Sequence, residues 1–324
     1  MNLPKVFPIT LFAVALAVLL ALPIPAVAKP KKTSFRNSQT QPCTTRTGLH
    51  CEIYGSGDPI LCLHGLGGSI YSWREFKGRF PNNQLILIDL RGAGQSPKPR
   101  DKGYSILTQA DLIFDFIQEH ELKNLTIVGN SYGGAVSLLV SIALTEKDPT
   151  RFSKLVLIDS GGYDKGLPGY LYLLRSVFGL PILEILGSKR VVTKVLNQSY
   201  AVPSRITKAQ IAAYAAPLND KNGKYALAQM AKQAIPADFK QIIAKYPCIK
   251  VPTLILWGDD DRVIPLSIGA MLRDAIPNSE LRIISSAGHI PQEEQPIATV
   301  CEIRKFLEPG YSCRPSPALT CPIK

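Results

Sequence analysis

Residues 125–134 read Leu-Thr-Ile-Val-Gly-Asn-Ser-Tyr-Gly-Gly, a GxSxG string that directly follows a short apolar run. The run predicts a buried strand, and a helical pattern begins at Tyr132. The glycines allow a tight turn that lifts the Ser131 hydroxyl above the sheet and lets neighbouring backbone approach it. The first amide groups of the helix would point to the same place. A GxSxG string alone is common, but this context predicts that Ser131 is a nucleophile rather than a bystander.

Similar short apolar runs recur on both sides of this stretch and alternate with helical patterns. The predicted strands are 51–54, 60–63, 85–89, 125–129, 155–159, 253–257 and 281–284. The clearest helical patterns are 107–120, 132–144 and 297–307. Continuous apolar strands that alternate with helices are typical of parallel strands buried on both faces. We therefore predict an α/β fold with a doubly wound, mostly parallel sheet.

One long segment, residues 163–250, separates two predicted strands and reads as helices. Thr207 to Gln210 has the spacing of a capping box before an apolar stripe. A structureless loop of this length is improbable in a compact domain. We predict that 163–250 form an inserted α-helical cap on a core made of 43–162 and 251–308. Seven cap residues are candidates to line a cleft, of which we expect fewer than half to contact substrate: Tyr163, Tyr170, Tyr172, Phe178, Leu180, Leu183 and Leu186.

The N-terminal 28 residues have the pattern of a signal peptide. Lys5 precedes an uncharged run, and small residues end the segment at Ala28. Cleavage after Ala28 would make the protein periplasmic or secreted. The alternative is an uncleaved membrane anchor, because the uncharged stretch 6–28 is just long enough to span a bilayer. Prolines within the stretch shorten its helix and favour cleavage.

Export would allow some of the seven cysteines to pair, although an odd number leaves at least one free thiol. A hairpin centred on Thr47 would place Cys43 and Cys51 opposite each other, at the short Cα separation that a disulfide needs. Cys62 lies within an apolar run and is predicted to be buried. Another bridge can come from among Cys301, Cys313 and Cys321.

The 324-residue chain has a formal net charge of +12, and its positive charge is unevenly distributed. Residues 163–250 contain 13 Lys and Arg against four Asp and Glu. Residues 29–42 read as a flexible basic linker, whereas 309–324, with four prolines, reads as an irregular tail. A basic cap and linker favour weak contact with an anionic membrane or envelope surface, or with an anionic substrate; a solvated helix face is the plainer explanation.

Several classes of function lack support in the sequence. No helix-turn-helix, zinc or aromatic-basic signature is present, so we predict no specific nucleic-acid binding. The cysteines form no CxxC or Cys/His cluster, so we predict no metal site. The oligomeric state is not set by any pattern in the chain.

A serine nucleophile needs an oxyanion hole and a base. Residues 64–68 read His-Gly-Leu-Gly-Gly directly after a predicted strand, and this turn can present a backbone N–H to an anion near Ser131. The amides of Leu66 and Tyr132 are therefore the candidate oxyanion pair. His64 is expected to order this loop. His289, which follows the last predicted strand, is the predicted base, because the other two histidines lie on a surface hairpin and at a helix end.

The imidazole in turn needs a carboxylate to hold it in the right tautomer. Residues 259–261 are three consecutive aspartates that follow a late strand. Asp159, at the end of the strand before the cap, is a further possible acid. On these grounds alone the choice stays open.

Taken together, the motifs resemble the α/β-hydrolase fold family over roughly residues 43–307. The family patterns HGxGG, DxRGxGxS and GxSxGG match residues 64–68, 89–96 and 129–134. The family acid follows a GxxD spacing, which implies Asp261, and the family histidine lies in a GH pair, as His289 does. The resemblance also implies structural roles for Asp89 and Arg91.

The resemblance implies a two-step acyl transfer without a cofactor or metal. Ser131 would attack a carbonyl with His289 as base, the amides of Leu66 and Tyr132 would stabilise the oxyanion, and water would deacylate the enzyme. We therefore predict an exported serine hydrolase that acts on a small-molecule carboxylic ester. Ser131 argues against the branches that carry aspartate at the elbow, the epoxide hydrolases and haloalkane dehalogenases.

Two alternatives stay open because the fold does not fix the substrate. The first is a lipase or a hydrolase of C–C bonds in ring-cleavage products that uses the same triad. Asn130 resembles the elbow of those hydrolases and of some bacterial lipases, although a turn-forming asparagine explains it equally well. The second is a ligand-binding, weakly catalytic family member, which a fluorophosphonate probe would leave unlabelled.

Overall fold

The computed structural model describes residues 43, 45–165 and 167–313. The predicted signal peptide (1–28), the predicted linker (29–42) and residues 314–324 of the predicted tail lie outside the described residues.

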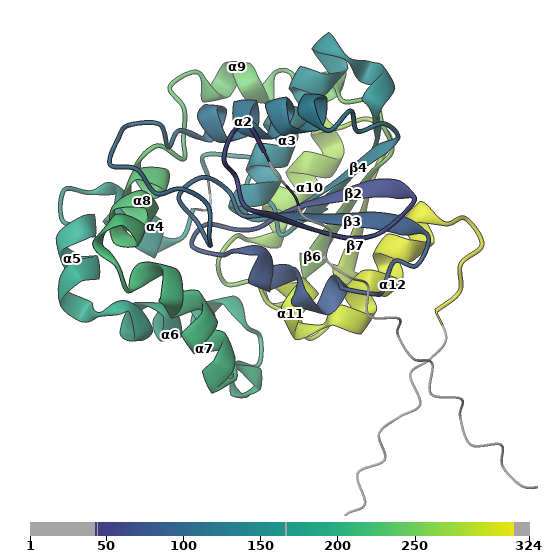
Figure 1. Ribbon diagram of the computed structural model, residues 1–324. Helices are drawn as coiled ribbons and strands as arrows, with labels where there is room; N and C mark the ends of the chain where they lie inside the picture. Colours follow the sequence, from purple (N-terminus) through teal and green to yellow (C-terminus); the bar gives the residue numbers. More distant parts are fainter. Residues whose placement is uncertain (1–42, 44, 166, 314–324) are drawn as a thin grey trace, which may run out of the picture. The chain divides into compact units, whose positions relative to one another are not determined.

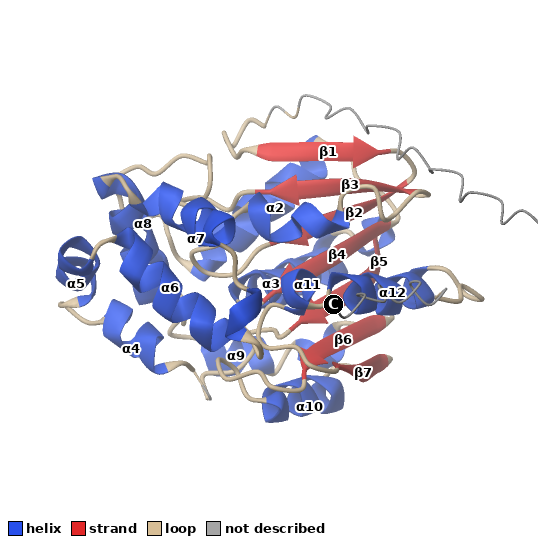
Figure 2. Ribbon diagram, turned by 90° about the horizontal axis from the view of Figure 1, so that it is seen from below, coloured by secondary structure: helices blue, strands red, loops and turns tan. Residues whose placement is uncertain are grey.

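A seven-stranded sheet forms the centre of the described chain (Figure 2). Its strands are β1 (Cys51–Gly55), β2 (Asp58–Leu63), β3 (Asn83–Ile88), β4 (Leu125–Asn130), β5 (Phe152–Ile158), β6 (Thr253–Gly258) and β7 (Ser279–Ile284). They lie in the order β1-β3-β2-β4-β5-β6-β7, and only β1, at one edge, runs antiparallel to its neighbour. The predicted mostly parallel, doubly wound sheet is confirmed.

Alternation along the strands divides the core between the two faces of the sheet. Leu61 and Leu63 of β2 pack in one cluster with α2 and α3, whereas Ile60 and Cys62 pack in another with η1 and α12. One face carries α2 (Ile106–Glu119), α3 (Tyr132–Lys147) and α10 (Leu266–Ala275). The other carries η1 (Ile70–Phe76), α11 (Pro291–Glu294) and α12 (Pro296–Leu307) (Figure 1). Burial on both faces explains the continuous apolar runs of the central strands.

The segment between β5 and β6 is helical and lies beyond the carboxyl ends of the parallel strands (Figures 1 and 2). Its helices are α4 (Gly169–Arg175), α5 (Gly179–Leu186), α6 (Ser188–Ser199), α7 (Lys208–Ala215), α8 (Lys221–Lys232) and α9 (Phe239–Ile243). The same segment contains the short 3-10 turns Pro203–Arg205, Ala216–Leu218 and Tyr246–Cys248, and one more, Pro149–Arg151, precedes β5. Thr207 and Gln210 form the predicted capping box at the start of α7. We call residues 163–250 the cap.

Two disulfides occur within the described residues. Cys43 pairs with Cys51 and Cys301 with Cys313, with Cα separations of 5.5 and 5.8 Å. The predicted hairpin around Thr47 is wrong. The chain there forms only a turn, and the residue opposite Cys51 in the sheet is Ile88 of β3. Cys62 is buried, as expected, and the exposed Cys248 has no disulfide partner among the described residues.

Candidate active site

Ser131 sits on a sharp turn between β4 and α3. Its φ of 55° and ψ of −117° are unusual for a residue with a side chain and store backbone strain at this position. Two glycines make the turn possible: a Cβ on Gly133 would lie 2.2 Å from the carbonyl oxygen of Leu63, and one on Gly134 would lie 2.2 Å from the Ser160 hydroxyl. The sequence therefore folds here so that the serine hydroxyl projects beyond the end of the sheet.

The structure brings Ser131, His289 and Asp261 into one chain of contacts. The Nε2 atom of His289 lies 2.7 Å from the Ser131 hydroxyl, and its Nδ1 atom lies 2.8 Å from Oδ2 of Asp261. The other Asp261 oxygen accepts backbone hydrogen bonds from Val263 and Ile264. Both His289 and Asp261 side chains are almost fully buried, so their interaction is weakly screened by solvent.

The other carboxylates that the sequence left open have different partners. Asp259 accepts a hydrogen bond from the backbone of Ala287, and the exposed Asp260 pairs with Arg262. Asp159 accepts one from the backbone of Gly258, and its second oxygen is buried without a partner. Among these four carboxylates, only Asp261 is hydrogen-bonded to His289.

Asp159 and Asp261 have opposite pKa shifts. Complete burial, and then the nearby Asp261 carboxylate, raise the pKa of Asp159 well above its ordinary value. Burial also opposes ionisation of Asp261, but the charge and hydrogen bond of His289 and two backbone N–H groups outweigh it and lower its pKa. The surroundings therefore favour the charged form of Asp261 and disfavour the charged form of Asp159.

The oxyanion-hole candidates lie beside the serine. Leu66 and Ser131 line the same cavity, and Tyr132 is the first residue of α3. Within the described residues, neither the Leu66 nor the Tyr132 backbone N–H donates to another protein group, so both are available to an anion. His64 stays apart from the serine: it donates to Gly65 and its Nε2 accepts from the backbone of Leu90, so it orders the loop as expected.

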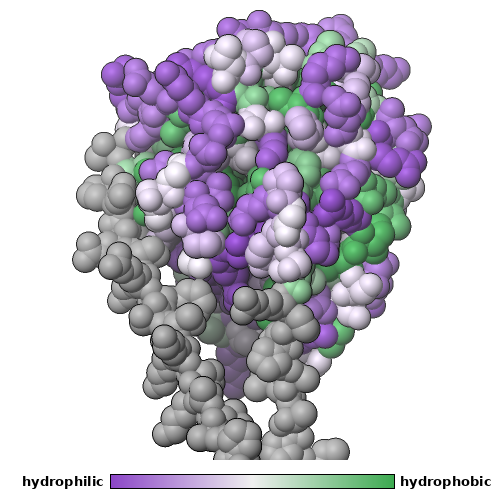
Figure 3. All heavy atoms as spheres, turned by 90° about the vertical axis from the view of Figure 1, so that its right-hand side faces the viewer, coloured by the Kyte–Doolittle hydropathy of each residue, from purple (hydrophilic) through white to green (hydrophobic). Residues whose placement is uncertain are grey.

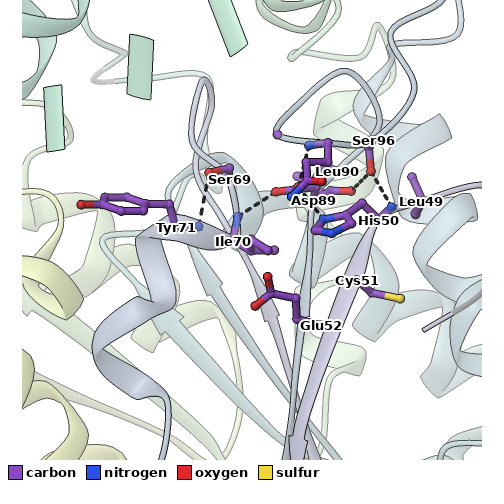
Figure 4. Close-up of polar contacts among 12 residues, drawn as sticks. Leu49, His50, Cys51, Glu52, Ser69, Ile70, Tyr71, Asp89, Leu90 and Ser96 are labelled. Carbon is purple, nitrogen blue, oxygen red and sulfur yellow. Dashed lines mark hydrogen bonds and ion pairs between the residues drawn. The ribbon is translucent and has the colours of Figure 1, made fainter. Parts of the chain in front are cut away.

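Asp89 organises the turn after β3 and has no contact with Ser131 or His289 in the structure. Its buried carboxylate accepts hydrogen bonds from the backbone of Ile70 and Gln95 and from the His50 ring (Figure 4). Ser96 bridges the same turn, donating to the Asp89 carbonyl and accepting from the His50 backbone. These contacts fix the start of η1 against the turn, which accounts for the DxRGxGxS motif structurally.

Asn130, next to the nucleophile, also has a structural explanation. Its side-chain amide donates to the carbonyls of Ile158 and His289, so it ties the elbow to β5 and to the histidine loop. The asparagine therefore does not by itself point to one substrate class.

Two cavity lobes meet at Ser131, and Leu66 and Tyr170 line both. The first lobe, of about 90 Å³, is closed mainly by apolar cap side chains such as Leu174, Val191 and Val195. The second, of about 70 Å³, lies toward Tyr163, Leu171, Ile235 and Phe239. No Lys or Arg is among the described residues that line either lobe.

The seven predicted cleft residues divide sharply. Tyr170 lines both lobes and Tyr163 lines the second, whereas the other five line neither lobe. Tyr172, Phe178 and Leu186 are exposed, and Leu183 is buried within the cap. Two of the seven therefore line the cavity, and contact with a substrate stays a prediction.

A buried glutamate that the sequence reading did not single out joins the cap to the histidine loop. Glu294 accepts backbone hydrogen bonds from Gly288, Ala201 and Val202, and its side chain is fully buried. The backbone N–H of His289 itself donates to Ser199 of the cap, at 2.7 Å. Glu293, which precedes Glu294, contacts Ser72, Arg74, Gln210 and Tyr214. In the sequence, only the two consecutive glutamates a few residues after the Gly-His pair could have indicated this contact.

The site residues include one geometry that is compatible with a metal. Ligand atoms of Asp159, Asp261 and His289 lie within 4.8 Å of one another. A cation there would compete with the Asp261 to His289 hydrogen bond, so these residues fit the hydrogen-bonded arrangement better than a metal site.

A parallel sheet with a serine at the turn after one central strand and a histidine after the last strand is the architecture of the α/β hydrolases. A family model described as the alpha/beta hydrolase fold matches residues 58–296. The chain therefore belongs to the α/β-hydrolase fold family, and it is a hydrolase.

Individual relatives differ in the reactions that their names give. Lipase 3 of a Moraxella species is 29% identical over 259 residues, which cover 78% of each chain. The 2-hydroxymuconate semialdehyde hydrolase of a Pseudomonas species is 25% identical over 281 residues, covering 81% of this chain and 90% of the relative. The solved structure of a 2-hydroxy-6-oxo-6-phenylhexa-2,4-dienoate hydrolase from a Rhodococcus species matches with a TM-score of 0.69 at 21% identity, over 80% of this chain and 94% of that one.

Proposed function

We propose that the protein is an exported serine hydrolase that cleaves an uncharged carboxylic ester through an acyl-enzyme. The contact that runs from Asp261 through His289 to Ser131, at the junction of two apolar cavity lobes, carries this proposal. An activated serine at such a junction can hold the acyl part of an ester in one lobe and the alcohol part in the other.

The reaction proceeds in two halves. In the first, Nε2 of His289 takes the Ser131 proton as the hydroxyl attacks the carbonyl, and the amides of Leu66 and Tyr132 stabilise the oxyanion. The imidazolium then gives its proton to the leaving alcohol. In the second half, His289 deprotonates a water that attacks the acyl-enzyme, and the proton returns to Ser131 as the acid leaves. Asp261 holds the imidazole in orientation and stabilises its charged form throughout.

The charge of the cavity bears on the substrate. A carboxylate moved into an apolar cavity without a cationic partner is strongly disfavoured. Since neither lobe is lined by Lys or Arg, an uncharged ester fits better than an anionic substrate. The relative named as a lipase supports an ester. Cleavage of a C–C bond is the second candidate, favoured by the relative named as a 2-hydroxymuconate semialdehyde hydrolase.

A fluorophosphonate probe and an ester series test this function. We expect the wild type to be labelled and to hydrolyse p-nitrophenyl esters, and Ser131→Ala to lose labelling and at least about 10³-fold in kcat/KM. An intact protein that takes no label would instead be a ligand-binding member. A vinylogous diketone cleaved faster than every ester would favour the C–C hydrolase.

Export rests on the N-terminal pattern of residues 1–28, and the two disulfides within the described chain support it, because disulfides persist in oxidising compartments. N-terminal sequencing of the protein from its producing cells is expected to begin at Lys29. A protein that still begins at Met1 and fractionates with membranes would be anchored instead.

A further inference from the structure

The exposed apolar side chains of the described chain are concentrated in one place. Six of the ten large exposed hydrophobic residues fall within residues 172–186, on α4, α5 and the turn between them. The remaining four, Leu107, Leu266, Ile283 and Ile297, lie on four different elements, α2, α10, β7 and α12. Single exposed apolar residues are ordinary, whereas a cluster marks an interaction surface. We call this cluster the α4–α5 patch; it consists of Tyr172, Leu173, Val177, Phe178, Ile185 and Leu186.

The patch lies on the outer side of the cap. In Figures 1 and 2, α5 is at the edge of the molecule farthest from the sheet. Val177 and Ile185 are 81% and 80% exposed, and Phe178 is 66% exposed. Figure 3 looks at the side of the molecule away from the cap, where hydrophilic residues cover most of the described surface and hydrophobic areas are smaller.

Basic side chains adjoin the patch. α6 begins two residues after α5 ends, and its exposed residues Lys189, Arg190 and Lys194 line an open groove. Within the described residues, none of the three makes an ion pair. Glu184 is the one acidic residue between 172 and 198. The apolar patch is therefore flanked by cations that no acidic side chain neutralises.

The helices that carry this surface also close the cavity. Leu174 of α4 and Val191 and Val195 of α6 line the first lobe, while Tyr172, Leu173 and the α6 cations are exposed and do not line it. The helices that carry the exposed surface are therefore the same helices that line the cavity at Ser131.

We propose that the α4–α5 patch and the adjacent cationic face of α6 dock the protein onto an anionic lipid bilayer, with the cap toward the lipid. Apolar side chains that enter the acyl boundary, flanked by lysine and arginine at the headgroups, are the chemistry that such a surface recognises. A second copy fits less well, because a two-fold contact through this surface would bring two sets of unpaired cations together.

The size of α4 and α5 indicates that these two helices lie in the interface rather than crossing it. Within the described residues no single helix is long and apolar enough to span a membrane, and α4 and α5 reach that length only as a pair bent by 106°. Helices of seven and eight residues bury their side chains only at the depth of the headgroup boundary.

A tryptophan reporter tests the docking at the surface itself. Trp73 and Trp257 are fully buried, so a new exposed tryptophan dominates any response to lipid. We would compare Phe178→Trp with Ile297→Trp, which replaces an exposed residue outside the patch, each in the full chain carrying Ser131→Ala. Binding is then measured without catalysis, and failure of the proposed function leaves the result intact.

We expect vesicles of brominated phosphatidylglycerol and phosphatidylcholine to quench and blue-shift the tryptophan fluorescence of Phe178→Trp. The fluorescence of Ile297→Trp should not change. Replacing Lys189, Arg190 and Lys194 together by Gln should weaken vesicle binding on the order of 100-fold at low salt. Replacing the exposed Lys102, Lys123 and Lys240 by Gln removes the same charge and should change binding little.

Three results would overturn the proposal. The first is no quenching at 178, even when the chain sediments with the vesicles through its N-terminal segment. The second is equal quenching at both positions. The third is a blue shift at 178 that depends on protein concentration without lipid and accompanies dimerisation, which would assign the surface to a second copy.

Discussion

The polar residues around Ser131 at the edge of the core and the residues on the outer face of the cap have opposite environments. Around Ser131, the polar groups of His289, Asp261, Asn130 and Asp89 have defined hydrogen-bond partners. On the cap, apolar side chains are exposed, and Lys189, Arg190 and Lys194 of α6 form no ion pair with any described residue. The two surfaces lie on opposite sides of the same thin layer of helices.

The polar side chains around Ser131 hold a fixed geometry, whereas the apolar side chains on the outer face of the cap are available to a partner. A buried polar network is costly unless it is satisfied, so the core holds one geometry. An exposed apolar patch costs nothing locally but has free energy to gain from a partner. Changes to the satisfied polar groups of the core should therefore reduce catalysis or stability, whereas Asp159, whose second oxygen has no partner among the described residues, should be replaceable without that loss. Changes in the patch should alter only where the protein binds.

The largest effect should come from Asp261. Asp261→Asn keeps the shape of the side chain but removes the charge that orients His289, so kcat should fall roughly 10³- to 10⁴-fold. Asp260→Asn, on the neighbouring exposed aspartate, is the matched control and should retain full activity on p-nitrophenyl esters. Equal losses in both variants would contradict the assignment of the acid.

The next largest effect should come from Glu294, which joins the two regions. Glu294→Gln places an amide donor either against the backbone N–H groups of Gly288 and Ala201 or against that of Val202, so the free energy of unfolding should fall by about 2–4 kcal/mol. Because the same change loosens the loop of His289, we expect kcat to fall more than KM rises. Glu308→Gln, which removes a partly exposed ion pair with Arg304, should cost less than about 1 kcal/mol in a urea titration.

Asp159 should make stability depend on pH. Its folded pKa is raised, so above the ordinary value near 3.8 the folded state holds a proton that the unfolded state has lost, and stability falls as pH rises toward the folded pKa. Asp159→Asn, which resembles the protonated acid, removes this loss. The variant should gain up to about 1.4 kcal/mol per pH unit relative to wild type in that window, with little change in kcat. A constant difference in unfolding free energy across the window would argue against a protonated Asp159.

The smallest effect on the enzyme itself should come from the patch. Val177→Ser with Ile185→Ser changes two mostly exposed side chains, so the free energy of unfolding should stay within about 0.5 kcal/mol and kcat on a soluble ester should stay unchanged. Leu183→Ser, a buried residue of the same helix, should be clearly destabilising in the same thermal-unfolding measurement. If Val177→Ser with Ile185→Ser lowered the stability as much as Leu183→Ser, the side chains of Val177 and Ile185 would be packed rather than exposed.

Much of the fold was readable from local patterns. All seven strands lie where apolar runs predicted them, and the helix that begins at Tyr132 follows the elbow as expected. Ser131 and His289 were identifiable because a glycine-rich turn and a scarce residue type leave a strong local signal. The bridge between Cys43 and Cys51 was predicted for a reason that proved wrong, since the strand partner of Cys51 comes from β3 rather than from a hairpin.

By itself, the sequence determined the order of the strands along the chain, the elbow, the identity of the histidine and the presence of a helical, basic cap, because periodicity and turn chemistry act over a few residues. The resemblance to the family already implied Asp261, and the structure shows the hydrogen bond between this aspartate and His289. The contacts by which Glu294 joins the cap to the histidine loop were visible only in the tertiary structure. Among the described residues, the tertiary structure also leaves apolar side chains of α4 and α5 exposed. Pairing and burial depend on which distant segment arrives at a side chain, and no local pattern records that.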